Sequence, residues 1–298
     1  VSASGTNSGS NTAMVGGGGH SISGAATYSG IFAGNALSMS GAYAAACGGS
    51  GNTVSGSYGF AGGGTGSTAS GSGSCVIASA TSSASGANSA AIGGNANAIT
   101  LASTNSGIFC GTGHALGATA ACTNCVILGG QSGTISNNCT SCAVIGVTGS
   151  GIVTNVTYSV ICGGSGGSIG TSSTRCFIAG GNSCTIVTCT SASIIGSFGG
   201  TISAGGDQAT LLGTISCAIA KGGTHLIASS TSCTIGNASL AAGNNDTIIG
   251  STSCLIGTVT AGATNCGIYS STGSSIQGAS ANCTISGGSS NLITNCTG

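Results

Sequence analysis

Charge is almost absent from this 298-residue chain, which has two basic residues, two acidic residues and no tryptophan or proline. The charged side chains are Arg175, Lys221, Asp207 and Asp246. Ordinary globular domains carry roughly a quarter charged residues. A basic patch cannot form from so few charges, so binding to nucleic acid through its phosphates has no electrostatic basis. We expect no nucleic-acid partner, and weak repulsion between copies favours association.

Other absences exclude further classes of protein. Collagen needs abundant proline and glycine at every third position, and neither is present. Disordered chains usually combine low hydrophobicity with high charge, whereas the mean hydropathy here is +0.48. No apolar run approaches the ~18 residues of a membrane span, so we expect no membrane insertion. The chain opens at Val1 with no initiator methionine or signal peptide, which predicts a processed chain or a fragment of a longer one.

The chain does contain glycine, at 60 positions, and a repeat of about 17 residues. A first row of apolar residues recurs with this period: Ile127, Val144, Ile161, Ile178, Ile195 and Leu212. A second row is Ile135, Ile152, Ile169 and Ile186. The spacing loosens outside this window, to between about 12 and 18 residues. Repeats of this length are typical of solenoids.

Each period holds two short β-prone stretches, such as 125–128 and 133–136, separated by the turn formers glycine, serine and asparagine. One unit cannot bury its apolar side chains alone, but stacked units align them into a narrow core. We therefore predict an all-β, parallel β-solenoid with about 17 residues per coil. Roughly 17 coils would form a rod on the order of 80 Å long.

We expect a single continuous solenoid domain over residues 1–298. The regular part is predicted at 88–240, with looser repeats at 1–87 and 241–298. Repeat-like residues reach both ends of the sequence. Coils without a cap would expose strand edges, which favour end-to-end pairing with a neighbour.

Seventeen cysteines are present, and ten of them stand two residues before an apolar residue, as in Cys125 with Ile127 and Cys75 with Ile77. Residues i and i+2 of a strand face the same side. If the aliphatic residue points inward, so does the thiol, which then behaves as a small buried apolar group. We therefore predict first that these cysteines pack in the core as thiols.

Three cysteine pairs are 17 residues apart, which places each pair on neighbouring coils: Cys122 with Cys139, Cys125 with Cys142, and Cys266 with Cys283. Coils about 4.8 Å apart bring the Cα atoms within the range of a disulfide. The spacing thus permits inter-coil disulfides as an alternative to core thiols, and the odd total leaves one cysteine over. The two CxxC pairs also match a zinc-ribbon spacing, but the repeat alone generates that spacing, so no metal site is predicted.

The residues for catalysis are scarce. His20, His114 and His225 lie among small residues, each far in sequence from a carboxylate. Asp207 and Asp246 form an acid–base pair only if folding brings them together. We predict surface positions for the aspartates, no catalytic residue, no cofactor and no enzymatic activity.

Outward threonines offer one alternative function. Regularly spaced threonines on a flat β-solenoid face are a feature of antifreeze proteins, and three pairs fit that pattern: Thr134/Ser136, Thr201/Ser203 and Thr284/Ser286. Gly151/Val153, Ser168/Gly170 and Ala218/Ala220 interrupt the array. Ice binding is therefore an alternative prediction, beside binding of glycans.

The segment Asn88–Ile99, with its Ile-Gly-Gly, resembles the head repeat of YadA-like trimeric autotransporter adhesins. Residues 126–130 and 177–181 resemble Ile-Gly-Gly repeats in tail-fibre-like proteins of phages and large DNA viruses. The resemblance implies a left-handed parallel β-roll, often trimeric, displayed outside a cell or particle. Two departures are the period, which is longer than the adhesin repeat, and the missing coiled-coil stalk.

Together these observations predict a structural segment of an extracellular or virion-surface fibre. Its partners would be further copies of itself, as a trimer or an end-to-end filament, with a host receptor or glycan as a further partner. The alternative is a ligand-binding solenoid that recognises ice or glycans.

Overall fold

The structure, a computed structural model, describes most of the chain. The described residues are 4–100, 102–117, 119–202, 206–215, 218–219, 222–232, 234–235, 244–249, 252–253, 255–256, 265–269, 271–278 and 280–296. They form two compact units, Val1–Gly149 (unit 1) and Ser150–Gly298 (unit 2). Each unit is described by itself, and the single continuous domain over 1–298 stays a prediction.

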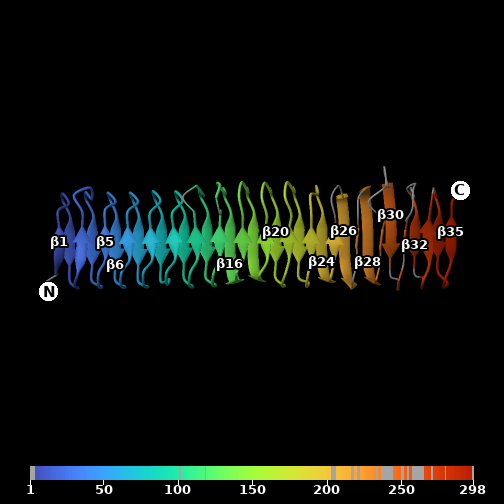
Figure 1. The fold of residues 1–298 in the computed structure, drawn as a ribbon, viewed down its shortest axis with the longest axis horizontal. Coiled ribbons are helices and arrows are strands. Elements are labelled where there is room, and N and C mark those ends of the chain that lie inside the picture. Colours follow the sequence, from blue (N-terminus) through green and yellow to red (C-terminus); the bar gives the residue numbers. More distant parts are fainter. Residues whose placement is uncertain are drawn as a thin grey trace. The chain divides into compact units, whose positions relative to one another are not determined.

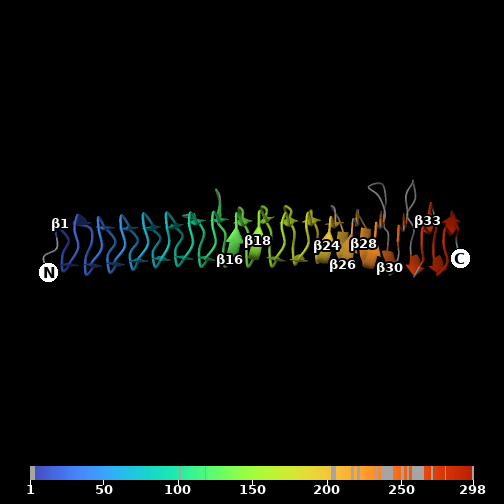
Figure 2. The same cartoon turned by 90° about the horizontal axis from the view of Figure 1, so that it is seen from below.

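All the elements of the described residues are β-strands, and they alternate between two parallel sheets (Figures 1 and 2). In each unit the odd-numbered strands form one sheet, the odd sheet, and the even-numbered strands form the other, the even sheet. Among these residues no helix is long and apolar enough to cross a membrane.

The strands of unit 1 are short, and most have two or three residues. The odd sheet holds β1 (Gly5–Asn7), β3 (His20–Ile22), β5 (Ser38–Met39), β7 (Thr53–Val54), β9 (Thr68–Ala69), β11 (Ser83–Ala84), β13 (Ala98–Ile99), β15 (Ala115–Leu116) and β17 (Thr134–Ile135). The even sheet holds β2 (Ala13–Val15), β4 (Gly30–Phe32), β6 (Ala45–Cys47), β8 (Phe60–Gly62), β10 (Cys75–Ile77), β12 (Ala90–Ile92), β14 (Gly107–Phe109), β16 (Val126–Gln131) and β18 (Ala143–Thr148).

Unit 2 repeats this alternation with some longer even strands. Its odd sheet holds β19 (Gly151–Ile152), β21 (Ser168–Ile169), β23 (Thr185–Ile186), β25 (Thr201–Ile202), β27 (Ala218–Ile219), β29 (Thr234–Ile235), β31 (Leu255–Ile256), β33 (Ser275–Gln277) and β35 (Leu292–Thr294). Its even sheet holds β20 (Val160–Cys162), β22 (Phe177–Ala179), β24 (Ser193–Phe198), β26 (Gly206–Ile215), β28 (Gly222–Thr231), β30 (Asn244–Ile249), β32 (Gly267–Tyr269) and β34 (Thr284–Ser286).

Every strand pairs in parallel with the equivalent strand of the next coil of its unit, so the predicted parallel β-solenoid is confirmed. In the regular window the register matches the predicted period, as where Ile127 lies opposite Val144. Elsewhere the coil is shorter or longer than predicted. Cys75 lies opposite Ala90, which comes before a full period is complete, and Gly107 lies opposite Val126, which comes after it.

The change in coil length falls in one connection only. Between the inward residue of an even strand and that of the following odd strand there are always eight steps, as from Ile127 to Ile135. The return connection takes seven steps from Val54 to Ala61 and eleven from Leu116 to Ile127. Insertions are therefore accommodated at the corner that leads from the odd sheet to the even sheet.

The predicted rows of apolar residues line the core, but the first row is partly wrong. Ile127, Val144, Ile161 and Ile178 are fully buried. Ile178 then lies opposite Ile194, while Ile195 lies opposite Ala179 and is 39% exposed.

The same shift applies in the next coil, where Leu211 is buried and Leu212 points outward opposite Ile195. The coil from β22 to β24 is shorter by a single residue than the predicted period. Since side chains alternate along a strand, this shift exchanges the two faces.

The second row is buried at every predicted position, namely Ile135, Ile152, Ile169 and Ile186. These residues line the inner side of the odd sheet, in β17 of unit 1 and in β19, β21 and β23 of unit 2. Ile22, Met39 and Val54 extend this lining toward the N-terminal coils of unit 1.

Candidate functional surfaces

The outer face of the even sheet is apolar in unit 1, whereas in unit 2 it mixes apolar with hydroxyl-bearing residues. We call the outward residues of its strands the even-sheet outer face. In unit 1, Val15, Phe32, Phe109 and Leu128 are 36–49% exposed. In unit 2, Ile195, Ile249 and Tyr269 are 38–39% exposed. A sheet with one wet face normally alternates apolar and polar residues, so a second apolar face indicates a surface that contacts something other than water.

Aromatic rings on this face lie over glycines of the same strand. A Cβ atom added to Gly30 would come within 2.7 Å of the Phe32 ring, and one added to Gly62 within 2.8 Å of the Phe60 ring. In unit 2, Gly267 and Tyr269 have the same relationship, at 2.7 Å. The rings therefore lie along the sheet and occupy the space that a side chain at the glycine would take. As a result the face is flatter than it would be with projecting rings.

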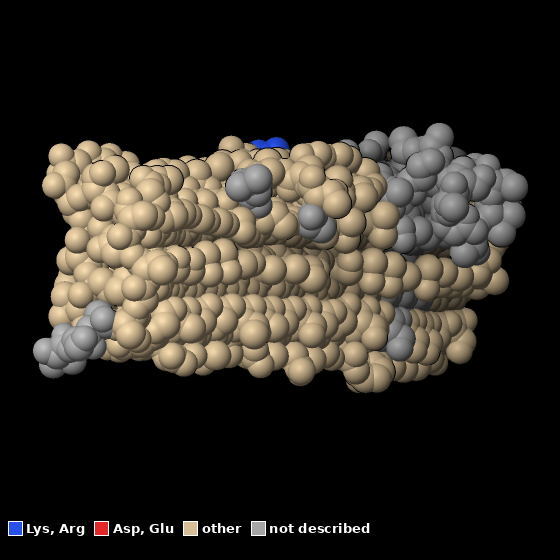
Figure 3. Space-filling model, turned by 60° about the vertical axis from the view of Figure 1, so that its left-hand side comes forward, with Lys and Arg blue, Asp and Glu red and all other residues tan. Residues whose placement is uncertain are grey.

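The outer face of the odd sheet is different in unit 1. Its outward positions carry hydroxyl groups in successive coils, at Ser21, Ser38, Thr53, Thr68 and Ser83. One solenoid unit thus has a hydroxyl-bearing face and an apolar face, one on each sheet. In the view of Figure 3 the described surface carries no acidic side chain, and basic atoms appear only at its upper edge.

The three threonine pairs predicted as an ice-binding array do not share one face. Thr134 and Thr201 lie at outward positions of the odd sheet, in β17 and β25. Thr284 and Ser286 lie in β34 of the even sheet. Ser203 is outside the described residues. The array fails because Thr284 precedes the inward Ile285 of an even strand, whereas Thr134 precedes Ile135 of an odd strand.

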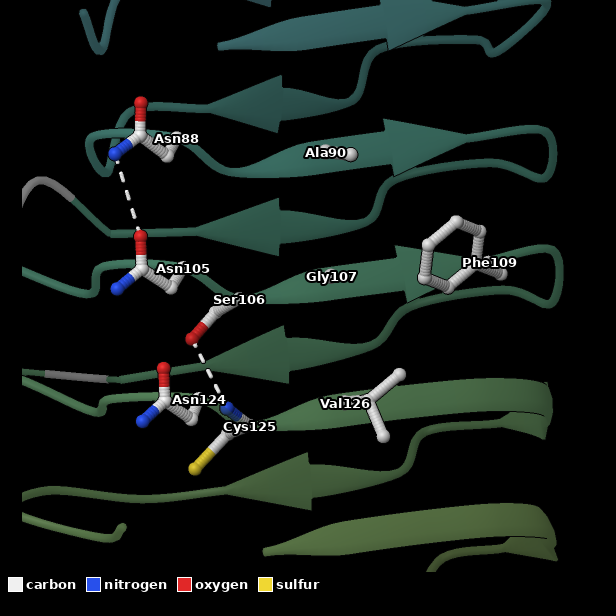
Figure 4. Close-up of a pocket in the computed structure, with 9 residues that line it drawn as sticks. All are labelled: Asn88, Ala90, Asn105, Ser106, Gly107, Phe109, Asn124, Cys125 and Val126. Atoms are coloured by element: carbon white, nitrogen blue, oxygen red, sulfur yellow. Dashed lines mark hydrogen bonds between the residues drawn. The ribbon is translucent and has the colours of Figure 1, made fainter. Parts of the chain in front are cut away.

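A shallow groove of about 460 Å³ crosses the even-sheet outer face of unit 1 (Figure 4). Ala90, Gly107 and Val126 form its floor on three neighbouring strands, and Phe109 stands at one side. The groove exists because the first two of these floor residues are small. Its apolar floor and its lack of charged residues suit a neutral ligand.

The other side of the groove is a column of asparagines at the corner before each even strand. Asn88, Asn105 and Asn124 all have φ between +51° and +56°, a left-handed conformation that asparagine tolerates. Asn88 Nδ2 donates a hydrogen bond to Asn105 Oδ1 over 3.3 Å (Figure 4). Repetition of one corner conformation thus lines up amide groups, each able to donate and accept hydrogen bonds.

The same corner carries tyrosines in earlier coils of unit 1. The rings of Tyr28 and Tyr43 stack with centroids 5.3 Å apart, and those of Tyr43 and Tyr58 with centroids 5.2 Å apart. All three rings are more than half exposed. Their φ values, between +51° and +57°, match those of the asparagines.

Most of the cysteines predicted to pack inward do so. Cys125, Cys142, Cys176, Cys266 and Cys283 are buried, two residues before an inward isoleucine or valine. Cys75 is an exception, because Val76 rather than Ile77 is the inward residue of β10, so the Cys75 side chain lies on the outer face.

Serine and cysteine share this inner column. Ser106 Oγ accepts a hydrogen bond from the Cys125 backbone N–H over 3.2 Å, and Ser159 Oγ accepts one from the Cys176 N–H over 3.0 Å. The thiol of Cys125 in turn donates to the carbonyl oxygens of Thr123 and Cys139, over 3.4 and 3.5 Å. These thiols therefore stand where other coils have a hydroxyl group.

The six cysteines of the predicted inter-coil pairs are thiols in the structure: Cys122, Cys139, Cys125, Cys142, Cys266 and Cys283. Disulfides between them stay a prediction for oxidising conditions. No cluster that could hold a metal ion occurs among the described residues.

Hydrogen bonding and burial shift the pKa values of these thiols. Contacts with Cys125 and Cys139 lower the pKa of Cys122, and its contact with Cys122 raises the pKa of Cys125. Burial raises the pKa of Cys176 and of Cys75. Raised values keep those two groups as neutral, weakly reactive thiols.

A second inner column lies two residues before the inward residues of the odd sheet, and in unit 1 it is polar apart from Leu37 and Gly133. In unit 1 it contains six buried polar side chains, namely His20, Asn52, Ser67, Ser82, Asn97 and His114. Each accepts a hydrogen bond from the backbone N–H at the equivalent position of the next coil.

The bonds of this column have ordinary lengths. Examples are Ser67 N–H to Asn52 Oδ1 at 3.0 Å and His114 N–H to Asn97 Oδ1 at 3.1 Å. The column satisfies buried backbone donors that a purely apolar core would leave unpaired. Two of the three histidines therefore have a structural place that the sequence did not predict.

The ladder also places His225 opposite Asp246, on neighbouring strands β28 and β30. Their separation along the chain is longer than the predicted period, so the period did not predict that they lie on neighbouring coils. Arg175, exposed at a corner with φ +56°, is the charged residue whose side chain the structure describes.

No protein-family model matches the chain. No curated protein matches it either.

Proposed function

We propose that this chain is a structural segment of an extracellular or virion-surface fibre, which acts by self-assembly and display. The observation that supports this proposal best is the unbroken parallel ladder of each unit, which runs from β1 to β17 and from β2 to β18 in unit 1. Each coil of a ladder is hydrogen-bonded to the coils before and after it. Such a unit resists extension along its axis through many backbone hydrogen bonds.

The chemistry of the surface supports a mechanical role over a catalytic one. Among the described residues the outer faces carry aliphatic, aromatic, hydroxyl, amide and thiol groups, and the polar inner column is used in backbone hydrogen bonding. Catalysis by acid–base or nucleophilic chemistry needs convergent titratable groups in a cleft. The described surface offers an amide-lined groove instead.

The experiment is immunogold electron microscopy on the source cells or particles, with an antibody to this chain. Gold along surface projections is the result we expect. Labelling confined to the cell interior, or to a smooth surface without projections, would contradict the proposal. Negative-stain images of the purified chain, in which we expect filaments rather than dispersed short particles, test self-assembly separately.

The groove of unit 1 favours one further candidate, the binding of a neutral glycan. Phe109 offers a ring for the apolar face of a sugar, and the amides of Asn88, Asn105 and Asn124 can hydrogen-bond to hydroxyl groups. A glycan array with the native chain tests this candidate. Binding that is lost in Asn105→Ala and kept in the distant corner variant Tyr43→Ala would support it, and an array without signal would exclude it.

A further inference from the structure

We propose that the even-sheet outer face binds a second copy of this chain, so that two apolar faces pack against each other. The inference rests on the proposed fibre function, because it names the partner and the surface of that self-assembly. Its evidence is separate, and comes from the chemistry and relief of one face.

The size of the face fits a contact between proteins. Nine strands about 4.8 Å apart, each about 10 Å wide, give unit 1 a flat area of about 400 Å². This area is similar to that of the largest apolar patch on a typical monomeric protein, a patch that is often functional. Pairing through this face of unit 1 would bury about 800 Å² over the two partners, which is the size of a weak, transient interface.

The face is flat enough to pack against a second flat sheet. Phe32, Phe60 and Phe109 lie along the sheet over Gly30, Gly62 and Gly107 instead of projecting from it. Two sheets pack face to face when their side chains fill the space between them, about 10 Å from backbone to backbone. Large residues beside glycines keep that distance even along the stack, except at the groove beside Phe109.

Charge does not oppose contact between identical faces. Proteins protect exposed β-surfaces from association with inward-pointing or edge charges, lysine above all. The outward residues of β2 to β18 include no lysine, arginine, aspartate or glutamate. Like-charge repulsion, which would separate two copies of most proteins, is therefore absent at this face.

Spacing favours a second copy over an unrelated protein. The outward side chains recur at the spacing of the coils, and another copy has the same spacing in the same chemistry. Two copies can thus match row for row along the face, whereas a partner without this period matches only a few rows. Contact of one face with the same face of its partner is the isologous arrangement of symmetric dimers.

The test compares lysine substitutions on the two sheets. Leu128→Lys with Ile195→Lys places one charge on the even-sheet outer face of each unit. Thr134→Lys with Thr201→Lys is the matched control, since these residues lie in the following odd strands, β17 and β25. Sedimentation equilibrium over a range of concentrations measures dimerisation, and circular dichroism confirms that each variant is folded.

We expect the native chain and the control to dimerise with similar affinity at concentrations below those at which end-to-end contacts form filaments. The face variant should dimerise roughly a hundredfold more weakly or worse, because an unpaired charge would be buried in an apolar contact. A native chain that is monomeric at all concentrations, or equal dimerisation of both variants, would overturn the inference.

Native thiols provide a second readout that needs no substitution. Cys47 and Cys162 lie half-buried on the even-sheet outer face, and Cys110 is exposed at a corner beyond it. Alkylation of Cys47 and Cys162 should slow in proportion to the dimer fraction as concentration rises, while Cys110 reacts at a constant rate. If all three react at constant rates in a sample that sediments as a dimer, another surface forms the contact.

The outcomes separate this inference from the fibre function. Gold-labelled surface fibres together with unimpaired dimerisation of Leu128→Lys/Ile195→Lys would overturn the face and leave the function standing. If the gold label is found only inside cells and the Leu128→Lys/Ile195→Lys variant fails to dimerise, the fibre function is overturned and the face stands. A monomer that binds a glycan at the groove would overturn the inference, because pairing would cover that groove.

Discussion

Gly133 donates its backbone N–H to Nδ1 of His114 over 2.9 Å, between neighbouring coils of unit 1. Nδ1 must therefore be unprotonated in the folded state. Leu37 and His20 repeat the arrangement, at 3.2 Å. A buried imidazole here replaces the amide or hydroxyl that Asn52, Ser67, Ser82 and Asn97 supply at the same position.

A drop in pH should lower the stability of unit 1, because it favours protonation of His114. Burial lowers the pKa of this imidazole below its usual range, whereas the unfolded chain keeps a value of about 6.5. Below that value the unfolded state binds more protons, so stability falls as the pH drops from about 7 toward the lowered pKa. Urea unfolding at a series of pH values measures the effect.

The variant His114→Asn is the control for this pH dependence. Asparagine accepts the same kind of hydrogen bond from the next coil, as Asn97 does from His114 N–H at 3.1 Å, but it does not titrate. The loss of stability in acid should be smaller in the variant than in the native chain. Equal slopes below a pH of about 6.5 would show that His114 is accessible to protons.

Ile194 and Ile195 are neighbours with opposite roles. Ile194 is fully buried and Ile195 is 39% exposed. Ile194→Ala should lower the free energy of unfolding by about 2–4 kcal/mol, because it leaves a cavity in a narrow core. Ile195→Ala should cost less than about 1 kcal/mol in the dissociated chain, measured by urea unfolding at low concentration. A larger effect at Ile195 would contradict the register of the shortened coil between β22 and β24.

The fold class was predictable from the period, because a row such as Ile127, Val144 and Ile161 has one explanation in stacked coils. The row failed at Ile195, where two isoleucines are adjacent and the sequence does not say which points inward. Only the register of the preceding coil decides between them. The sequence also did not predict the longer coil that places His225 opposite Asp246, because a fixed period does not show where a coil is lengthened.

The candidate surfaces were less predictable than the core. The sequence did not show that the rings of Phe32 and Phe109 lie on the outer face, over glycines. The apolar signal is the same for inward and outward residues when both faces of a sheet are apolar. Alternation, which normally separates the faces, is then absent.

Glycine at the tight corner should be irreplaceable. The shortest coils of unit 1 turn through Gly41, Gly56 and Gly71, and a Cβ atom on Gly56 would clash with the carbonyl oxygen of Gly71 in the next coil. Gly56→Ala should destabilise the chain by about 1–3 kcal/mol or more, as overpacking of a fixed backbone does. Thermal unfolding compares it with Gly24→Ala, where the nearest atom would be at an ordinary 3.6 Å. Equal melting temperatures would disprove the close approach.

Cysteine and serine should be interchangeable in the inner column of the even sheet. Cys125→Ser should change the free energy of unfolding by less than about 1 kcal/mol, because the hydroxyl keeps the carbonyl partners Thr123 and Cys139. Ile127→Ser, two residues on, should cost about 3 kcal/mol or more, since its site is fully buried and apolar. Urea unfolding under reducing conditions measures both, and a severe loss from Cys125→Ser would contradict the shared role.

The central claim is that successive coils stack in register, so that equivalent inward side chains form continuous columns. A crystal structure or a cryo-electron microscopy map that resolves side chains tests it most directly. We predict that Ile127 lies against Val144 and that Ile178 lies against Ile194, with Ile195 on the outside. A map with substantial helix, or with these residues scattered through the molecule, would contradict the account.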